Sequence, residues 1–137
     1  MAEIPEELKK AQDFHAHLGP YLVIGMRMGE AVTKRLGNQR FTTKILAYTG
    51  TTPPLSCIID GLQLTTPCTV GNGGIKISSE GEARIKATKG QKTLCISLKE
   101  EVKRDVEAAF SSRSQEEIAL NLWGMPEEEL LEVQEDL

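Results

Sequence analysis

The sequence contains few histidines, cysteines and aromatic residues, and these shortages limit the kinds of site that it can build. Its 137 residues include two histidines, three cysteines, one tryptophan, two tyrosines and three phenylalanines. An odd and sparse set of cysteines is unlike the dense, even framework of a small secreted domain, so we expect reduced thiols. No two cysteines have the short spacing of a zinc knuckle, so a metal has to be held by distant segments.

The sequence also lacks the patterns of membrane spans and of nucleic-acid surfaces. No uninterrupted apolar run approaches the ~18 residues of a membrane span, and the acidic first residues do not form a signal peptide. The net charge is −4 and no basic block alternates with aromatic residues, which argues against a nucleic-acid partner. We therefore expect a soluble, cytoplasmic protein with a single domain over residues 1–137 and no membrane contact.

The signatures of several common enzyme classes are missing as well. The chain has no H-E-x-x-H motif, no serine nucleophile elbow, no P-loop and no dinucleotide-binding glycine pattern. Standard hydrolase, NTPase and dehydrogenase mechanisms therefore have no support, and the sequence leaves open whether the protein is an enzyme.

Strands are expected in the middle of the chain, with helices on either side of them. Periodicity and turn residues predict helices at 5–14, 20–36, 55–65, 99–110 and 114–123, the last opened by a capping box. Alternating apolar residues predict strands at 41–49, 75–78, 83–88 and 93–97. The last three strands are expected to form an antiparallel meander, and residues 131–135 fit either a helix or an edge strand. This order predicts an α+β fold, in which a central antiparallel or mixed sheet of short strands packs with helices from the N-terminal and C-terminal parts.

The two histidines, His15 and His17, occupy a turn directly before an amphipathic helix that Pro20 is suited to begin. A helix start leaves backbone N–H groups unpaired and carries a positive partial charge. Groups beside it can hold an anion or present neutral imidazoles to a metal. A hydrogen-bonded structural role explains such a turn equally well, so both interpretations stay open.

Cys57 is predicted just inside the start of the helix that follows Pro53 and Pro54, where the helix dipole favours a thiolate. Asp60 lies about one turn further along the same face, so the two side chains can address one partner. Gln63 continues that face. The alternative is a buried structural cysteine with a capping carboxylate.

The other cysteines have weaker claims to a site. Cys57 and Cys68 are eleven residues apart, and a continuous helix would separate their backbones by about 16 Å, which disfavours a two-cysteine metal site. Cys68 precedes the glycine-rich stretch 71–74, which does not match a phosphate cradle and which turn chemistry explains. Cys95 falls in an apolar strand pattern and is expected in the core.

The helix at 20–36 carries two further features with competing interpretations. Arg27 lies among apolar residues, so it pairs either with a carboxylate such as Asp60 or with the acid group of a ligand. Gly25 and Gly29 form a small-residue face, whose expected use is close packing against the body of the domain.

Four segments together resemble the FmdE family, which is named for a subunit of formylmethanofuran dehydrogenase. They are FHAHLGP at 14–20, GMRMG at 25–29, CIIDGLQ at 57–63 and CTVGNG at 68–73. Their order and spacing fit the family, and the resemblance covers residues 8–135. It implies functional positions at His15, His17, Arg27, Cys57, Asp60, Gln63, Cys68, Thr69 and Gly71.

The chain departs from the family pattern in several places. Gly19 stands where many members have cysteine, which removes one thiolate from the site. Asn72 replaces the lysine of the glycine loop, and Tyr21 replaces a glycine, adding a phenol that can line the cleft or bind a ligand. Longer members carry a cysteine-rich zinc module after this domain, which has no counterpart here.

The resemblance leads to one main hypothesis on function. The protein is expected to be a homodimer whose cleft binds a divalent metal, with zinc as first choice, or a metal-linked small ligand, through His15, His17 and Cys57. If the cleft is catalytic, His17 and Cys57 act as metal ligands or as base and nucleophile, while Asp60 orients an imidazole. A cofactor is expected at Tyr21, Arg27, Gln63, Cys68, Thr69 and Gly71.

The same resemblance supports two non-enzymatic alternatives. The family name implies a link to methanogenesis, with a molybdenum or tungsten enzyme of one-carbon metabolism as a partner. The protein would then be an accessory module that delivers metal or cofactor. In the other alternative the site is degenerate because Gly19 lacks a thiol, which leaves a dimeric interaction module that the faces of Gly25 and Gly29 and an edge strand would suit.

Overall fold

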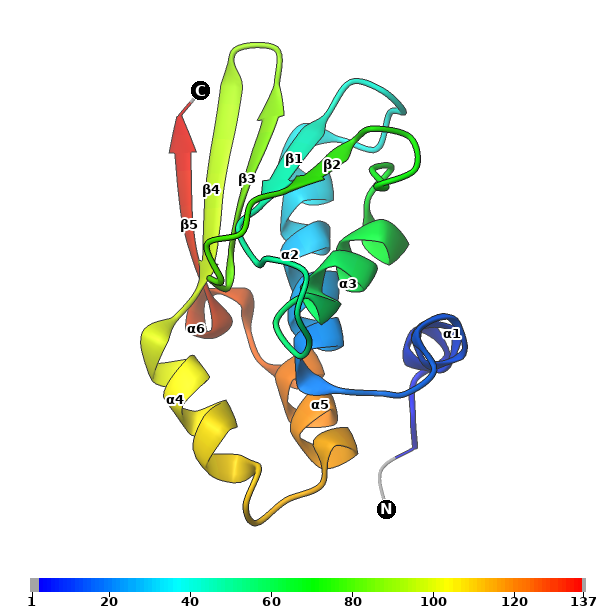
Figure 1. Ribbon diagram of the computed structural model, residues 1–137, viewed down its shortest axis with the longest axis vertical. Coiled ribbons are helices and arrows are strands. Elements are labelled where there is room, and N and C mark those ends of the chain that lie inside the picture. The colour runs from blue at the N-terminus through cyan, green and yellow to red at the C-terminus, as the bar shows by residue number, and fades with distance from the viewer. Residues whose placement is uncertain (1–2, 137) are drawn as a thin grey trace.

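The computed structural model describes residues 3–136, and its centre is a five-stranded mixed sheet (Figure 1). The strands are β1 (Lys44–Ala47), β2 (Ile75–Ile77), β3 (Arg84–Lys89), β4 (Lys92–Leu98) and β5 (Leu131–Asp136). They lie in the order β2-β1-β3-β4-β5, in which β2 pairs parallel with β1 and the other neighbours pair antiparallel. Together with the helices, this sheet confirms the predicted α+β fold.

The predicted meander is correct for β3 and β4 but wrong for β2. Strand β1 lies between β2 and β3, because the chain leaves β1, passes through the helix α3 (Cys57–Thr65) and returns beside β1 in the same direction. A parallel pair needs such a crossover, and Ile45 then faces Ile75 across the pair. The alternation of side chains along β2 carries no information on which neighbour it takes.

Segment 131–135, which fitted either a helix or a strand, is an edge strand. Leu131 pairs with Leu98 and Val133 with Ile96, so the apolar residues of β5 lie on the same face as those of β4. Only the preceding short helix α6 (Glu127–Leu130) is helical in this acidic stretch.

The helices lie close to their predicted positions. They are α1 (Glu6–His15), α2 (Pro20–Leu36), α3, α4 (Glu100–Ala109), α5 (Gln115–Gly124) and α6. The hydroxyl of Ser114 accepts a hydrogen bond from the backbone N–H of Glu117 at 3.1 Å, which is the predicted capping box of α5. Among residues 3–136, no helix is both long and apolar enough to cross a membrane.

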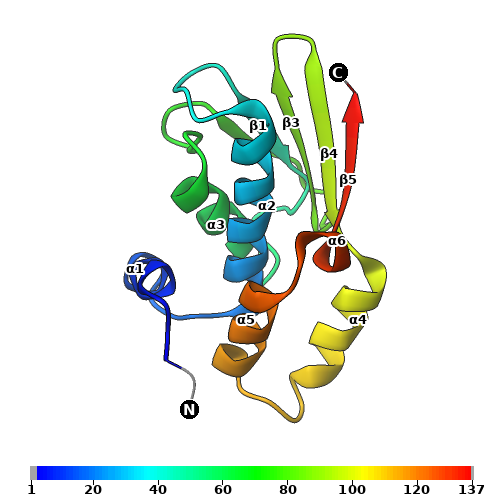
Figure 2. The same ribbon diagram turned by 180° about the vertical axis from the view of Figure 1, so that it is seen from behind.

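Helices α2 and α3 cover one face of the sheet, as the view from behind shows (Figure 2). Leu22, Ile24 and Met28 of α2 are fully buried in the core between them. The backbones of the two helices pack closely at two glycines, where no larger residue would fit. A Cβ at Gly25 would overlap the carbonyl of Ile58, and one at Gly61 would overlap backbone atoms of α2. The face of Gly25 and Gly29 is therefore used for packing inside the chain, and it is not a dimer surface.

Candidate functional site

The His-x-His turn lines a cleft of about 370 Å³, which we call the histidine cleft. The cleft is lined by His15, His17, Gly19, Pro20, Tyr21, Leu22, Pro53, Pro54, Cys57, Phe110 and Gln115. Ala16 adopts a left-handed conformation with φ of 83°, which ends α1 directly after His15. Gly19 is extended and Pro20 begins α2, so the turn between the helices is held at both ends. The two imidazole rings stack with their centroids 5.4 Å apart.

His15 is held by Asp60. Its Nδ1 lies 2.5 Å from Oδ2 of the carboxylate, and 12% of the imidazole side chain is exposed. Since a carboxylate accepts hydrogen bonds, the neutral ring carries its proton on Nδ1 and keeps the lone pair of Nε2. Nε2 has no hydrogen-bond partner within residues 3–136. Asp60 also accepts a hydrogen bond from Gln63 at 3.3 Å, which positions the carboxylate.

His17 is held by a residue that the sequence reasoning missed. Its Nε2 lies 3.0 Å from Oε1 of Gln115, the first residue of α5, and both side chains are exposed. Gln115 stands 98 residues from His17 in the chain, within an ordinary capping box. No local pattern marks it, so only the packing of α5 beside α2 reveals the contact.

Gly19 leaves the space that the His17 and Gln115 side chains occupy. A Cβ built at Gly19 would lie 2.8 Å from Nε2 of His17 and 3.2 Å from Oε1 of Gln115. A side chain at this position would therefore point at the hydrogen bond between them. Gly19, the position at which the family resemblance leads us to expect a cysteine, therefore lies inside the cleft.

Cys57 lies at the start of α3 as predicted, yet its thiol is less acidic than a helix start suggests. Burial raises the pKa of Cys57, and the carboxylate of Asp60 raises the pKa further. Burial and the negative charge of Asp60 therefore act against the thiolate that the helix start was expected to favour. The thiol is partly buried and lines the cleft.

Tyr21 and Arg27 are both on α2, but only Tyr21 lines the cleft. Burial raises the pKa of its phenol, with a smaller contribution from the charge of Glu107. Arg27 points instead to the end of α5, where its guanidinium donates to the carbonyls of Leu122, Trp123 and Met125 at 2.8, 3.1 and 2.6 Å. Its carboxylate partner is Glu30 at 3.3 Å, not Asp60. Arg27 fastens α5 to α2.

The loop 69–74 lies outside the cleft and is closed by its own hydrogen bonds. Oδ1 of Asn72 accepts from the N–H groups of Thr69 and Gly74 at 3.0 and 2.8 Å. Oγ1 of Thr69 accepts from the N–H of Asn72 at 2.9 Å. Oε1 of Gln63 accepts from the N–H of Val70 at 2.9 Å. The structure therefore does not bring Gln63, Thr69 and Gly71 into the histidine cleft.

Neither Cys68 nor Cys95 lines the cleft. Cys68 is 2% exposed, and its thiol donates to the carbonyl of Thr43 at 3.2 Å. Cys95 is only partly buried, which corrects its expected place in the core. It lies on the face of the sheet opposite α2, because β4 alternates and Leu94 and Ile96 take the buried positions.

A ready-made metal centre is not present in the part of the chain that the structure describes. No three His, Cys, Asp or Glu side chains among residues 3–136 stand together in an arrangement that could hold an ion. His15, His17 and Cys57 line one cleft, so their chemistry suits a zinc-type ion, but the donors would have to converge on it.

Comparisons with known proteins bear on the fold and on the family. A crystal structure of an FmdE-like protein from Syntrophus aciditrophicus, likened by its description to a component of tungsten formylmethanofuran dehydrogenase, matches with a TM-score of 0.74 at 22% identity, over 96% of this chain and 70% of that chain. A protein of Archaeoglobus fulgidus named "Probable S-adenosyl-L-methionine-binding protein" is 32% identical over 73 residues, which are 50% of this chain and 19% of that relative. The chain thus spans about a fifth of that relative's length. The family described as "FmdE, Molybdenum formylmethanofuran dehydrogenase operon" matches residues 14–132. With its fold and most of its length matched, the chain belongs to the FmdE family.

Proposed function

We propose that the histidine cleft binds a divalent metal ion, with zinc as first choice, alone or as part of a small ligand. His15, His17 and Cys57 would hold the ion. The observation that carries the proposal is the bond between His15 and Asp60, which fixes Nδ1 and leaves Nε2 with a free lone pair beside two other donors. A carboxylate that orients a histidine in this way is the usual neighbour of a metal-ligating imidazole.

The surrounding residues would control how the donors meet the ion. Gln115 holds Nε2 of His17, so this ring either offers Nδ1 or gives up its hydrogen bond. The raised pKa of Cys57 means that binding through sulfur displaces a proton, so the affinity would rise with pH. A bound zinc ion with these protein ligands would supply an open position for water or for a ligand.

An accessory role is the second candidate. The family description refers to the operon of a molybdenum enzyme, and the matched crystal structure is described as like a component of a tungsten enzyme. In this role the cleft would carry metal or cofactor to such an enzyme, and no turnover would be found in the isolated chain. If the cleft is degenerate instead, substitution of its histidines should change neither metal binding nor partner binding.

Elemental analysis of anaerobically purified, tag-free protein tests the proposal. The variants His17→Ala and Cys57→Ala are compared with Cys95→Ala, a matched control for a partly buried cysteine outside the cleft. The proposal predicts about one metal ion per chain in the wild type and the control, and a loss in both cleft variants. Wild type that stays metal-free after incubation with zinc would contradict it.

Calorimetry with S-adenosylmethionine, the ligand in the name of the Archaeoglobus fulgidus relative, separates a metal site from an organic pocket. Binding of that ligand by metal-free protein, abolished by His17→Ala, would assign the cleft to the organic ligand in place of the metal.

The predicted homodimer needs a different surface from the one first considered. Gly25 and Gly29 of α2 are enclosed by α3, because a Cβ at Gly25 would overlap the backbone of Ile58 near the start of α3 and one at Gly29 would overlap Oγ1 of Thr65 at its end. A second copy of the chain cannot reach them.

A further inference from the structure

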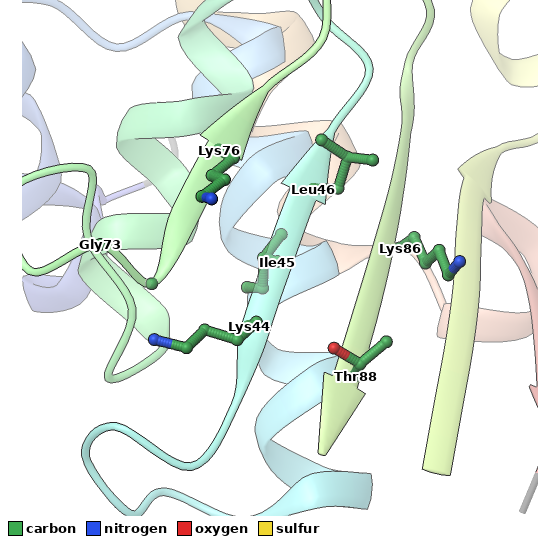
Figure 3. Close-up of a pocket in the computed structure, with 8 residues that line it drawn as sticks. Lys44, Ile45, Leu46, Gly73, Lys76, Lys86 and Thr88 are labelled. Atoms are coloured by element: carbon green, nitrogen blue, oxygen red, sulfur yellow. The ribbon is translucent and has the colours of Figure 1, made fainter. Parts of the chain in front are cut away.

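A shallow hollow bordered by lysines, which we call the lysine hollow, lies on the face of the sheet that points away from α2 and α3 (Figure 3). Its volume is about 470 Å³, within the usual range of small-molecule pockets, roughly 300–1,000 Å³. Its lining comes from three neighbouring strands and the loop before β2, namely Lys44, Ile45, Leu46, Gly73, Gly74, Lys76, Lys86 and Thr88. None of these residues lines the histidine cleft, so the two sites are separate.

The lysine hollow lies in the positive part of a negatively charged chain. Residues 38–98 hold seven Lys and Arg but three Asp and Glu, a net charge of +4, although the whole chain has a net charge of −4. The three strands that line the hollow all belong to this segment. Positive charge around a concave surface raises the local concentration of anions. The sequence thus places its excess of positive charge where the sheet is hollowed.

The lysines of the hollow have no acidic partner, in contrast to an arginine near them. Lys44, Lys76 and Lys86 are exposed, and none of them forms an ion pair within residues 3–136. Arg84, on the same face of β3 as Lys86, is neutralised by Glu82 at 2.8 Å. The ammonium groups of the three lysines are therefore available to an anion.

The register of the sheet gathers these lysines around one apolar side chain. Lys76 and Lys86 are the neighbours of Leu46 on β2 and β3, and Lys44 lies two residues before Leu46 on β1. Neighbouring strands are about 4.8 Å apart and alternate residues share a face, so the three charges border one patch. In Figure 3 the ammonium groups of Lys44 and Lys76 lie on the side of Gly73, and that of Lys86 lies towards β4. An anion beside Gly73 would meet two ammonium groups.

The donors that are present favour a phosphate group. The N–H groups of Gly73 and Gly74 are already bonded within the loop, so side chains alone would hold an anion. Lysine is a compact point charge that commonly binds phosphate, whereas planar carboxylates suit the forked guanidinium of arginine. Two ammonium groups balance the charge of a phosphate monoester, about −1.5 to −2 at neutral pH. The hydroxyl of Thr88 adds a neutral donor.

The lysine hollow has room for more than a phosphate group. Leu46 is half-buried and lies between the lysines, so part of its side chain is open to the hollow. A phosphate held by Lys44 and Lys76 leaves this apolar surface to contact another part of the same ligand. Small-molecule sites commonly combine such an apolar wall with a few polar groups that fix the orientation of the ligand.

We propose that the lysine hollow binds a small phosphorylated organic molecule, with its phosphate group on Lys44 and Lys76 and its apolar part on Leu46. Lys86 adds attraction at longer range. An acidic protein partner would also match the charge, but it requires neither a hollow nor an apolar wall. The proposal does not depend on any metal in the histidine cleft.

Isothermal titration calorimetry of the full chain with phenyl phosphate, a phosphate monoester with an apolar ring, tests the proposal. The wild type should bind about one molecule per chain with a dissociation constant below about 1 mM, and added salt should weaken the binding. Lys44→Gln with Lys76→Gln should weaken it about tenfold or more, because both counter-charges are lost. The control, Lys9→Gln with Lys10→Gln, removes the same charge from exposed lysines of α1 and should bind like the wild type.

A further variant tests the apolar part of the site. Leu46→Thr suits a strand, since threonine is common in sheets, and it removes apolar surface from the hollow. The affinity for phenyl phosphate should fall about threefold or more, whereas the affinity for inorganic phosphate should not change. Unchanged binding of phenyl phosphate would contradict the contact with Leu46. Circular dichroism shows whether each variant is folded.

Three results would overturn the proposal. The wild type binds neither phenyl phosphate nor pyrophosphate more tightly than about 1 mM, or the folded lysine variant binds like its control, or benzoate binds as tightly as phenyl phosphate. The last result would assign the hollow to a carboxylate. Binding of polyglutamate that is lost in the lysine variant, without binding of phenyl phosphate, would assign the lysines to an acidic protein partner instead.

Discussion

The histidine cleft and the loop 69–74 are both rich in polar residues, but they differ in what their hydrogen bonds leave free. In the loop, the side chains of Asn72, Thr69 and Gln63 satisfy backbone N–H groups at 2.8 to 3.0 Å. In the cleft, Asp60 and Gln115 each occupy one nitrogen of a histidine and leave the other for a ligand. A polar motif marks a binding site when its donors and acceptors are not used up by the fold.

The largest expected effect comes from breaking the helix contact that supports both regions. Helix α2 carries Tyr21 of the cleft, while α3 carries Gln63 of the loop, and the two meet at Gly25. Gly25→Val should lower the free energy of unfolding by about 3 kcal/mol or more, because its side chain would overlap the backbone of α3. Urea denaturation measures this loss. Gly124→Ala, at a position with nothing within 4 Å of a Cβ, is the control and should unfold like the wild type.

A smaller loss of stability is expected from a substitution in the loop than from one in the cleft's supporting helices, and it should not affect ligand binding. Asn72→Ala removes the acceptor for two N–H groups and the donor to the carbonyl of Pro67. We expect it to lower the free energy of unfolding by about 1–2 kcal/mol and to leave the ligand affinity of the cleft unchanged. His17→Ala should do the reverse, with a change in stability within about 0.5 kcal/mol, since the side chain is exposed. Equal losses of stability in both variants would remove the distinction between the regions.

The ion pair of Arg35 with Glu127 is another polar site whose groups bind each other and not a ligand. Its contribution to the free energy of unfolding should depend on pH. Arg35 donates to Glu127 at 3.0 and 2.7 Å, and this hydrogen bonding holds the pKa of Glu127 below its ordinary value. Its contribution to stability is therefore present above the unfolded pKa and is lost as the pH falls through the folded pKa. Glu127→Gln should lower the free energy of unfolding by about 1 kcal/mol at neutral pH, with a difference that shrinks in acid. Glu128→Gln is the matched control, and a pH-independent difference would refute the assignment.

The smallest expected effect concerns the reactivity of Cys57 in the cleft. The charge of Asp60 contributes to the raised pKa of Cys57, so Asp60→Asn should lower that pKa. Alkylation by iodoacetamide at a fixed pH below 9 should then be several-fold faster, because more of the thiol is ionised. Asp105→Asn on α4 controls for the change in net charge. An unchanged rate profile against pH would show that Asp60 does not act on the thiol.

Features that depend on neighbouring residues could be predicted from the sequence, and features that depend on distant contacts could not. The helix after Pro20, the cap at Ser114 and the hairpin of β3 and β4 follow from local turn and capping chemistry. The position of β1 between β2 and β3 could not be predicted, because a strand pattern does not specify a partner.

The same division holds for the cleft. The sequence pointed to His15, His17 and Cys57, and the structure places them around one cavity. It could not reveal Gln115, which meets His17 only through packing, nor the burial that sets the Cys57 pKa. The sequence left Arg27 open between a carboxylate partner and the acid group of a ligand, since its actual partners on α5 lie more than ninety residues away.

A zinc titration of the wild type, His17→Ala and Asn72→Ala against a chromophoric chelator tests the central claim most directly. Our account predicts that the wild type and Asn72→Ala bind about one ion per chain with the same affinity, and that His17→Ala binds at least about tenfold more weakly. Equal binding by all three proteins, or an equal loss in both variants, would contradict the claim that the histidine cleft, and not the loop, is the binding site.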